Sequence, residues 1–156
     1  MEVYEEDYRG LEEALRRLRR DSNAKAVFLI DKNGQQIAAA GDIENFDSTS
    51  LASLTAGNVA ATDGLAKLIG EREFSVLFHE GQRDHIHISI VARRAILLVI
   101  FDERSSLGLV RLRVKRASAE MDRIFEEMAD RSQRSRAEPS PFSEITDEDI
   151  DSLFSE

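Results

Sequence analysis

Apolar residues recur at helical spacing near the start of the chain. They stand at intervals of 4, 3, 4 and 3 residues, with Glu and Arg between them, and are Tyr4, Tyr8, Leu11, Leu15 and Leu18. A stripe of this period buries one side of a helix and leaves the other in solvent. The pattern therefore predicts an amphipathic helix that ends near residues 21–23.

Two short strands are predicted next. The run AKAVFLI, residues 24–30, is almost continuously apolar and partly β-branched, as is typical of a central strand covered on both faces. It is followed by Asn33-Gly34, which tolerate the positive φ of a tight turn, and then by QQIAAAG at 35–41. This order predicts an antiparallel hairpin.

Three more strands are predicted in the second half of the chain. They are SVLFHE at 75–80, HIHISIVA at 85–92 and AILLVIF at 95–101. In the middle one, isoleucine alternates with histidine or serine, which is the period of a strand with one buried face. The third is apolar throughout, which places it in the interior of a sheet.

Residues 105–132 combine two patterns. LGLVRLRVK alternates like a strand, whereas the apolar positions from Val110 to Met128 keep helical spacing through a region rich in Ala, Glu, Met and Arg. We interpret this segment as one long helix. The predicted order is then α-β-β-α-β-β-β-α, an α/β (α+β) fold with a five-stranded antiparallel sheet.

The segment between the two groups of strands, residues 47–71, predicts a helix with two unlike faces, capped by Asp47 or Ser48. One face collects large apolar side chains and is interpreted as the stripe that packs on the core. Its members are Leu51, Leu54, Ala61, Leu65, Leu68 and Ile69. The opposite face collects Ser53, Ala56, Gly57, Ala60, Asp63, Gly64 and Lys67.

This second face lacks the covering of Glu, Lys, Gln and Arg that a solvated helix surface usually carries. Gly57 and Gly64 each cost about 1 kcal/mol relative to alanine inside a helix, so a compensating contact is expected. Two explanations remain open at this point. Small residues allow close packing inside the domain, or they provide a flat contact surface for a second protein.

Composition and charge narrow the classes of function. The chain has 156 residues, which suits one domain, and no cysteine, which excludes a disulfide framework and a thiol-based zinc site. The amino terminus lacks the pattern of a signal peptide and no apolar run reaches membrane-spanning length, so we expect a cytoplasmic protein. The net charge of −9 disfavours a nucleic-acid partner, because phosphate binding needs a cationic surface.

The carboxyl-terminal residues differ in composition from the rest. Residues 133–142, QRSRAEPSPF, contain both prolines and are interpreted as a flexible linker after a domain at 1–132. Residues 143–156 carry six of the nine excess negative charges and no Lys or Arg. They predict a short acidic amphipathic helix that orders on a partner, either its own domain or another protein. The apolar anchors of this acidic segment are Phe142, Ile145, Ile150, Leu153 and Phe154.

Other candidate sites are weaker. The spacing from Gly57 to Lys67 does not fit a phosphate-binding loop, so no nucleotide cofactor is expected. His85 and His87 lie two residues apart on one strand and could share a metal, but exposed strand histidines are far commoner, and no metal is expected. No catalytic arrangement stands out in the sequence.

A basic run stands near the start of the last predicted helix. It consists of Arg111, Arg113, Lys115 and Arg116. Such a run is usually a solvated helix face. It could also contact an acidic surface, including the chain's own acidic segment.

Several stretches of the sequence resemble bacterial proteins of the Roadblock/LC7 domain family. They are LASLTAGNVAATDGLAKLIGE, VFLIDKNGQ and FHEG in the flanking strands, SLGLVRLRVKRAS and the terminal SPFSEITDEDIDSLFSE. The resemblance covers nearly the whole chain. It implies the element order given above and a homodimer in which the two copies of the second helix lie side by side and the sheets join edge to edge.

The resemblance also implies a function. Relatives bind a small Ras-like GTPase that controls polarity and motility at bacterial cell poles, and they accelerate its GTP hydrolysis without supplying an arginine finger. Two copies of the chain per GTPase and enrichment at a cell pole are expected, and the chain itself is not expected to be an enzyme. The alternative is a Roadblock scaffold that docks polarity or motor proteins without stimulating hydrolysis.

In such relatives the paired second helices form the platform on which the GTPase sits. Carried over to this sequence, the contact line is Ala56, Ala60 and Gly64, bordered by Thr55, Asp63 and Lys67. The acidic segment is expected to bind the GTPase away from its nucleotide pocket through its apolar anchors. This second contact would raise affinity or promote nucleotide exchange.

Overall fold

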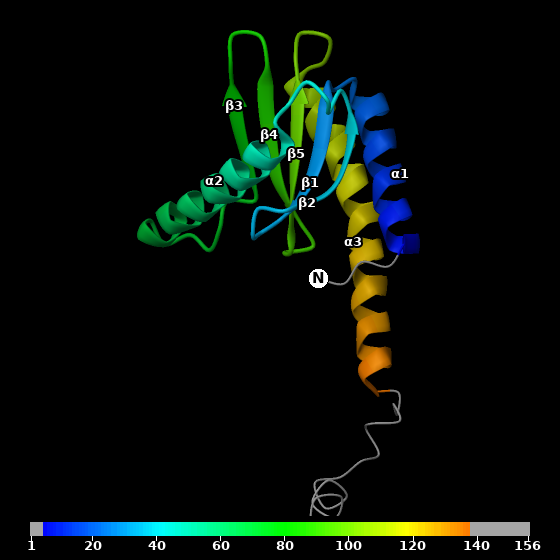
Figure 1. Ribbon diagram of the computed structural model, residues 1–156. Coiled ribbons are helices and arrows are strands. Elements are labelled where there is room, and N and C mark those ends of the chain that lie inside the picture. Colours follow the sequence, from blue (N-terminus) through cyan, green and yellow to red (C-terminus); the bar gives the residue numbers. More distant parts are fainter. Residues whose placement is uncertain (1–4, 138–156) are drawn as a thin grey trace, which may run out of the picture.

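The computed structural model describes residues 5–137, and residues 1–4 and 138–156 lie outside this part. Helices and strands follow one another in the predicted order (Figure 1). Their bounds are α1 (Glu5–Ser22), β1 (Ala26–Asp31), β2 (Gln36–Gly41), α2 (Ser48–Leu68), β3 (Val76–Glu80), β4 (His85–Val91), β5 (Ala95–Phe101) and α3 (Leu107–Ala137). No helix within residues 5–137 has both the length and the apolar character that crossing a membrane requires.

The five strands form one antiparallel sheet in the order β2-β1-β5-β4-β3. The most apolar strands, β1 and β5, lie side by side near its middle, with Ala26 opposite Ile100 and Asp31 opposite Ala95. Every residue of β5 is buried, as the sequence predicts for an interior strand. The predicted hairpin of β1 and β2 is confirmed, and Gly34 in its turn has a φ of +89°.

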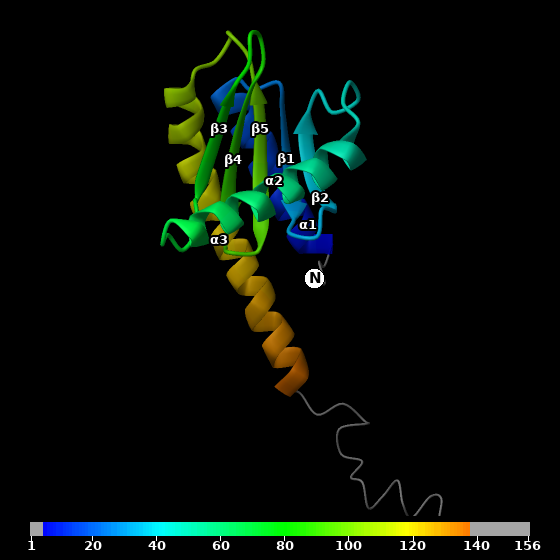
Figure 2. The same cartoon turned by 90° about the vertical axis from the view of Figure 1, so that its left-hand side faces the viewer.

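Helices cover both faces of the sheet (Figures 1 and 2). α1 and α3 pack together on one face, where Leu15, Val99 and Phe125 belong to one core cluster. α2 lies on the other face, where Phe28 and Leu98 belong to a second cluster. Because successive side chains of a strand point to opposite faces, the same strands supply both clusters.

α3 is longer than the sequence predicts. It runs for 31 residues from Leu107 to Ala137, so the first five residues of the expected linker at 133–142 are helical. These residues, QRSRA, contain no proline, and Gln, Arg and Ala favour helices. The rest of the expected linker and the acidic segment lie outside the described residues.

Candidate protein-binding surface on the second helix

The side chain of Asp47 fixes the first turn of α2. Its Oδ1 accepts a hydrogen bond from the backbone N–H of Ser50 at 3.2 Å, and its Oδ2 accepts one from the Ser50 hydroxyl at 2.7 Å. These hydrogen bonds from Ser50 hold the pKa of Asp47 below its usual value. Of the two residues that the sequence offered as caps, Asp47 is the one that caps the helix.

The side of α2 that faces the sheet carries small side chains. Its buried residues are Ala52, Thr55, Val59 and Ala66. Ala52 and Val59 belong to the same core cluster as Phe28 of β1. The β1–β2 turn also lies close to the helix, because a Cβ atom at Gly34 would stand 3.3 Å from the Cα of Ser53. Small residues therefore let α2 approach the sheet.

The core stripe predicted for α2 is wrong. Its large members are exposed, with 59% of the surface accessible for Leu65 and 83% for Leu68, and Leu54 and Ile69 lie between these values. Ala61 is exposed as well, and Leu51 is only half-buried. The strands already fill this core with Phe, Ile and Leu side chains, so the helix packs there with its alanine, threonine and valine side.

We call the exposed side of this helix the α2 outer face. It consists of Ser53, Leu54, Gly57, Ala60, Ala61, Gly64, Leu65, Lys67 and Leu68. At about 100° per residue, the small residues form one strip, and the leucines with Ala61 form a second strip beside it. Lys67 is the single charged member of the α2 outer face. A contiguous apolar surface of this kind is typical of sites of protein interaction.

The two glycines of the α2 outer face have open space around them. A Cβ atom added at Gly57 or at Gly64 would meet no atom within 4 Å. Close packing inside the chain therefore does not account for these glycines within residues 5–137. Of the two explanations that the sequence left open, contact with a second protein is the one that the geometry favours.

The residues expected to form a platform do not all reach the surface. The exposed ones are Ala60, Gly64 and Lys67, and the half-buried ones are Ala56 and Asp63. Thr55 is a correction, because it is only 6% exposed. It lies three residues after Ala52 and four before Val59, which places all three on the buried side of the helix. The other expected contacts, from Phe142 to Phe154, lie outside the described residues.

Strand β3 is an open edge of the sheet. It pairs only with β4, and Val76 and Phe78 are exposed. Figure 2 shows that α2 crosses the sheet from the β2 side toward the β3 side. An edge strand presents unpaired N–H and C=O groups to which a second chain can add. The β3 edge and the end of α2 therefore offer adjoining surfaces for association.

Within residues 5–137, no three His, Asp or Glu side chains come together in a way that could hold a metal. The Nδ1 of His85 accepts a hydrogen bond from the N–H of Gly81 at 3.2 Å. His87 is 1% exposed, and its burial, followed by the charge of Arg111, lowers its pKa. His85 is thus engaged in a local hydrogen bond, whereas the buried Nδ1 of His87 has no partner among residues 5–137. The α2 outer face carries no arginine.

The chain is similar to a known family of domains and to solved structures. The family model for the Roadblock/LC7 domain matches residues 10–101. MglB from Myxococcus xanthus is 58% identical, the match covers 81% of this chain and 96% of that protein, and the TM-score is 0.77. Gliding protein MglB from Thermus thermophilus is 37% identical over 80% of this chain and 95% of that protein, with a TM-score of 0.76.

A third structure, MglB with a tetrameric arrangement, is 36% identical over 80% of this chain and 94% of its own, with a TM-score of 0.74. No curated protein matches the chain.

Proposed function

The chain belongs to the Roadblock/LC7 domain family, and from this premise we propose that it regulates a small Ras-like GTPase of the MglA type. In this proposal the chain accelerates GTP hydrolysis by the GTPase and thereby helps to set cell polarity and motility. The 58% identity to MglB supports a partner of this type. The single observation on which the proposal depends most is the α2 outer face, an exposed apolar surface with two glycines at which an added Cβ atom would meet no atom within 4 Å.

The working unit is a homodimer. Two copies associate through the leucine strip of the α2 outer face, and their β3 edges pair. Fully burying a leucine side chain contributes roughly 1.5–3 kcal/mol, so Leu54, Leu65 and Leu68 of each copy supply a substantial part of the association free energy. Pairing of the edges also gives partners to the backbone groups that β3 leaves open.

The paired helices present their small-residue strips to the GTPase. Ala60, Gly64 and Lys67 make the contact, with Ala56 and Asp63 at its border. A GTPase that binds across the twofold axis of the dimer blocks the binding of a second GTPase, so two copies of this chain bind one GTPase. Thr55 takes no direct part and supports the platform from its buried side.

The chain acts by arranging the catalytic groups of its partner. α2 contains no arginine, so its outer face has no arginine finger to donate. Instead, the dimer binds the GTPase more tightly when the mobile loops of the GTPase hold the arrangement that hydrolysis requires. A partner can shift such an equilibrium only by its difference in affinity for the two states, and this difference lowers the barrier.

The acidic segment makes a second contact with the GTPase, away from the nucleotide. It is tethered to the platform through the chain that leaves α3 at Ala137, which raises its local concentration near a bound GTPase. This contact raises affinity or promotes nucleotide exchange.

Phosphate release by the cognate GTPase, measured in a single turnover with increasing amounts of this chain, tests the proposal. An activator raises the rate until two chains are present per GTPase. A Roadblock scaffold that docks polarity or motor proteins would bind the GTPase and leave the rate unchanged, and that result would contradict the proposed activation.

A further inference from the structure

A groove runs between α3 and the edge strands, on the face of the sheet away from the α2 outer face. Its volume is about 540 Å³. Arg111 and Lys115 of α3, Val76 of β3, and His87 and Ser89 of β4 line it. On this face α1 packs on β1 and β2, and α3 contacts β4.

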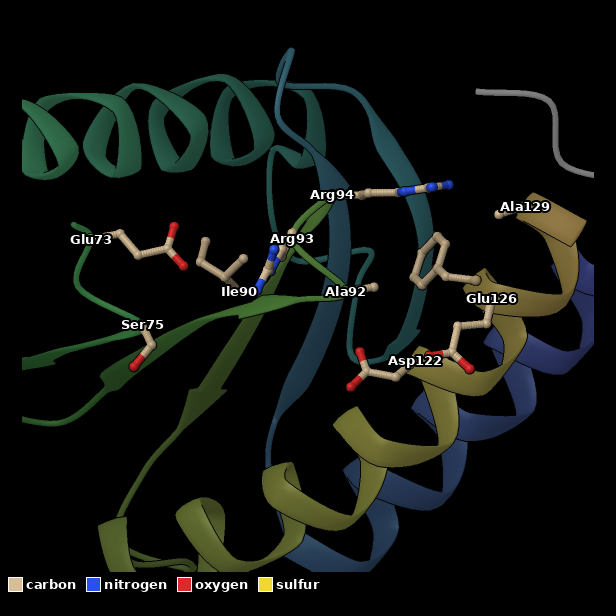
Figure 3. Close-up of a pocket in the computed structure, with 10 residues that line it drawn as sticks. Glu73, Ser75, Ile90, Ala92, Arg93, Arg94, Asp122, Glu126 and Ala129 are labelled. Atoms are coloured by element: carbon tan, nitrogen blue, oxygen red, sulfur yellow. The ribbon is translucent and has the colours of Figure 1, made fainter.

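A second hollow of about 400 Å³ continues this groove (Figure 3). Ser75, Ile90 and Asp122 line both. Along α3 the lining residues run from Arg111 to Ala129, a distance of about 27 Å at a rise of 1.5 Å per residue. A channel of this length suits a peptide segment.

The floor of the groove holds two buried polar side chains that have no hydrogen-bond partner among the described residues. His87 is 1% exposed and Ser89 is 5% exposed, and the unpartnered atoms are Nδ1 of His87 and Oγ of Ser89. A buried polar group without a partner is costly, so a ligand that brings polar groups to this floor gains affinity. The side chain of Val76, which is exposed beside these two residues, offers apolar contact to the same ligand.

The rim of the groove and the adjoining surface of α3 are positively charged. The basic side chains there are Arg111, Arg113, Lys115, Arg116 and Arg123. None of these five forms an ion pair within residues 5–137. The nearby carboxylate of Glu120 is already paired with Arg17 of α1. Asp122, whose Oδ1 is also buried without a partner among the described residues, is the only acidic residue that lines the groove itself, and Glu73 and Glu126 line the hollow that continues it. The part of the groove beside Arg111 and Lys115 therefore favours an acidic ligand with apolar anchors.

We propose that residues 143–156 of the same chain bind in this groove. The acidic segment has six carboxylates and no Lys or Arg, which complements the unpaired cations of α3. Its Ile and Leu side chains complement Val76 and the exposed Leu112 at the edge of the groove. The proposal goes beyond regulation of a GTPase and does not depend on it.

The length of the chain permits this arrangement. α3 ends at Ala137, about 22 Å along the helix from Asp122 and about 39 Å from Arg111. An extended chain spans about 3.3 Å per residue, so residues 138–144 cover about 23 Å and reach the near end of the groove. The remaining 12 residues span about 18 Å as a helix, which matches the stretch of α3 between Asp122 and Arg111.

A bound acidic segment would be withheld from other partners. The segment would then have two destinations, the groove of its own chain and any acidic-peptide site of a partner. A partner would gain the segment only by displacing it from Arg111 and Lys115. The basic run of α3 would thus control when the segment is available.

Paramagnetic relaxation enhancement in the full-length chain tests the proposal. Because the chain has no cysteine, Ser152→Cys gives a unique site for a nitroxide label. We expect selective broadening of the amide signals of Ser75, Val76 and Ser118, with no such broadening in α2. Absence of broadening at the groove, or broadening centred on α2, would overturn the proposal.

Charge reversals on both sides of the contact complete the test. Arg111→Glu with Lys115→Glu should abolish the broadening, whereas Lys32→Glu with Arg83→Glu, an equal charge change at two exposed turn positions, should preserve it. Asp147→Lys with Asp151→Lys leaves residues 5–137 unchanged and should also abolish it. If labelled chains broaden the signals of unlabelled, isotope-enriched chains instead of their own, the assignment to the same chain is wrong.

Discussion

At the scale of single residues, the absence of a side chain distinguishes Gly57 and Gly64. Each costs about 1 kcal/mol relative to alanine in a helix interior. No contact within residues 5–137 offsets this cost, because a Cβ atom at either position would meet no atom within 4 Å. A second protein that approaches this side of α2 would supply the missing contact. In our proposal a complex, and not the isolated chain, accounts for these two glycines, because they lie together on one apolar side of α2.

His87 should make the stability of the chain depend on pH. Burial, and then the charge of Arg111, lower its pKa below the ordinary value of 6.5. The folded chain then binds the proton less readily than the unfolded chain, so the free energy of unfolding falls as the pH drops below that value. In chemical denaturation we expect His87→Gln to lose less stability than the wild type between about pH 7 and about pH 5. An equal loss in both proteins would contradict this role of His87.

At the scale of secondary-structure elements, α2 depends on its cap. Asp47→Ala removes both hydrogen bonds from Ser50 and should lower the Tm by roughly 2–8 °C. Asp63→Ala is the matched control in the same helix, and alanine should leave its Tm unchanged or slightly higher. Equal decreases in the two variants would show that the cap does not hold α2.

The leucine strip should hold two copies of α2 together. Leu65→Ser with Leu68→Ser removes two exposed apolar side chains, and the Kd of the dimer should rise at least about tenfold, which corresponds to about 1.4 kcal/mol. Leu112→Ser on α3 is the control, because Leu112 is 62% exposed but lies outside the α2 outer face. Sedimentation equilibrium measures the Kd of each protein. A wild-type affinity of the double variant would place the dimer contact elsewhere.

The strands could be predicted from the sequence, whereas the orientation of α2 could not. The apolar run of β5 indicates burial directly, and the structure confirms it. The alternation of β4 predicts a single buried face of isoleucines, and this is wrong, because α3 packs against the opposite face and leaves His87 and Ser89 only 1% and 5% exposed. In α2 only Asp63 and Lys67 are charged, so the pattern has no polar face that marks the solvent side. The side with the large leucines then looks like the side that packs on the core. Phe28 and the large strand side chains around it already fill this core, so α2 packs there with its small residues. How much space the strands leave is known only once the sheet is assembled.

Thr55 is included among the expected contacts through the family resemblance, and the structure places it on the buried side of α2. One signal in the sequence could have warned of this, because a helix that is apolar all round is covered on more than one side. That signal predicts a second contact but not which side makes it. The exposure of Ala60, Gly64 and Lys67 could be predicted from the sequence, whereas the burial of Thr55 could not.

At the scale of the whole molecule, two surfaces of opposite character lie on opposite faces of the sheet. The α2 outer face is apolar and nearly uncharged, and the groove beside α3 is rimmed by Arg111 and Lys115. In our account the first surface pairs two copies of the chain and carries the GTPase. The second holds the acidic segment, so the two surfaces bind by different physical means and can be altered independently.

The central claim is that the α2 outer face is the contact surface for the GTPase. Single-turnover GTP hydrolysis with Gly64→Arg and with Gly108→Arg tests it most directly, because both glycines are helical, exposed and free of neighbours within 4 Å. Sedimentation first establishes that both variants remain dimeric. We expect Gly64→Arg to lower the stimulated rate by at least about tenfold, since an arginine there holds the surfaces apart, while Gly108→Arg keeps the wild-type rate. Full stimulation by Gly64→Arg at the same protein concentration would contradict the account.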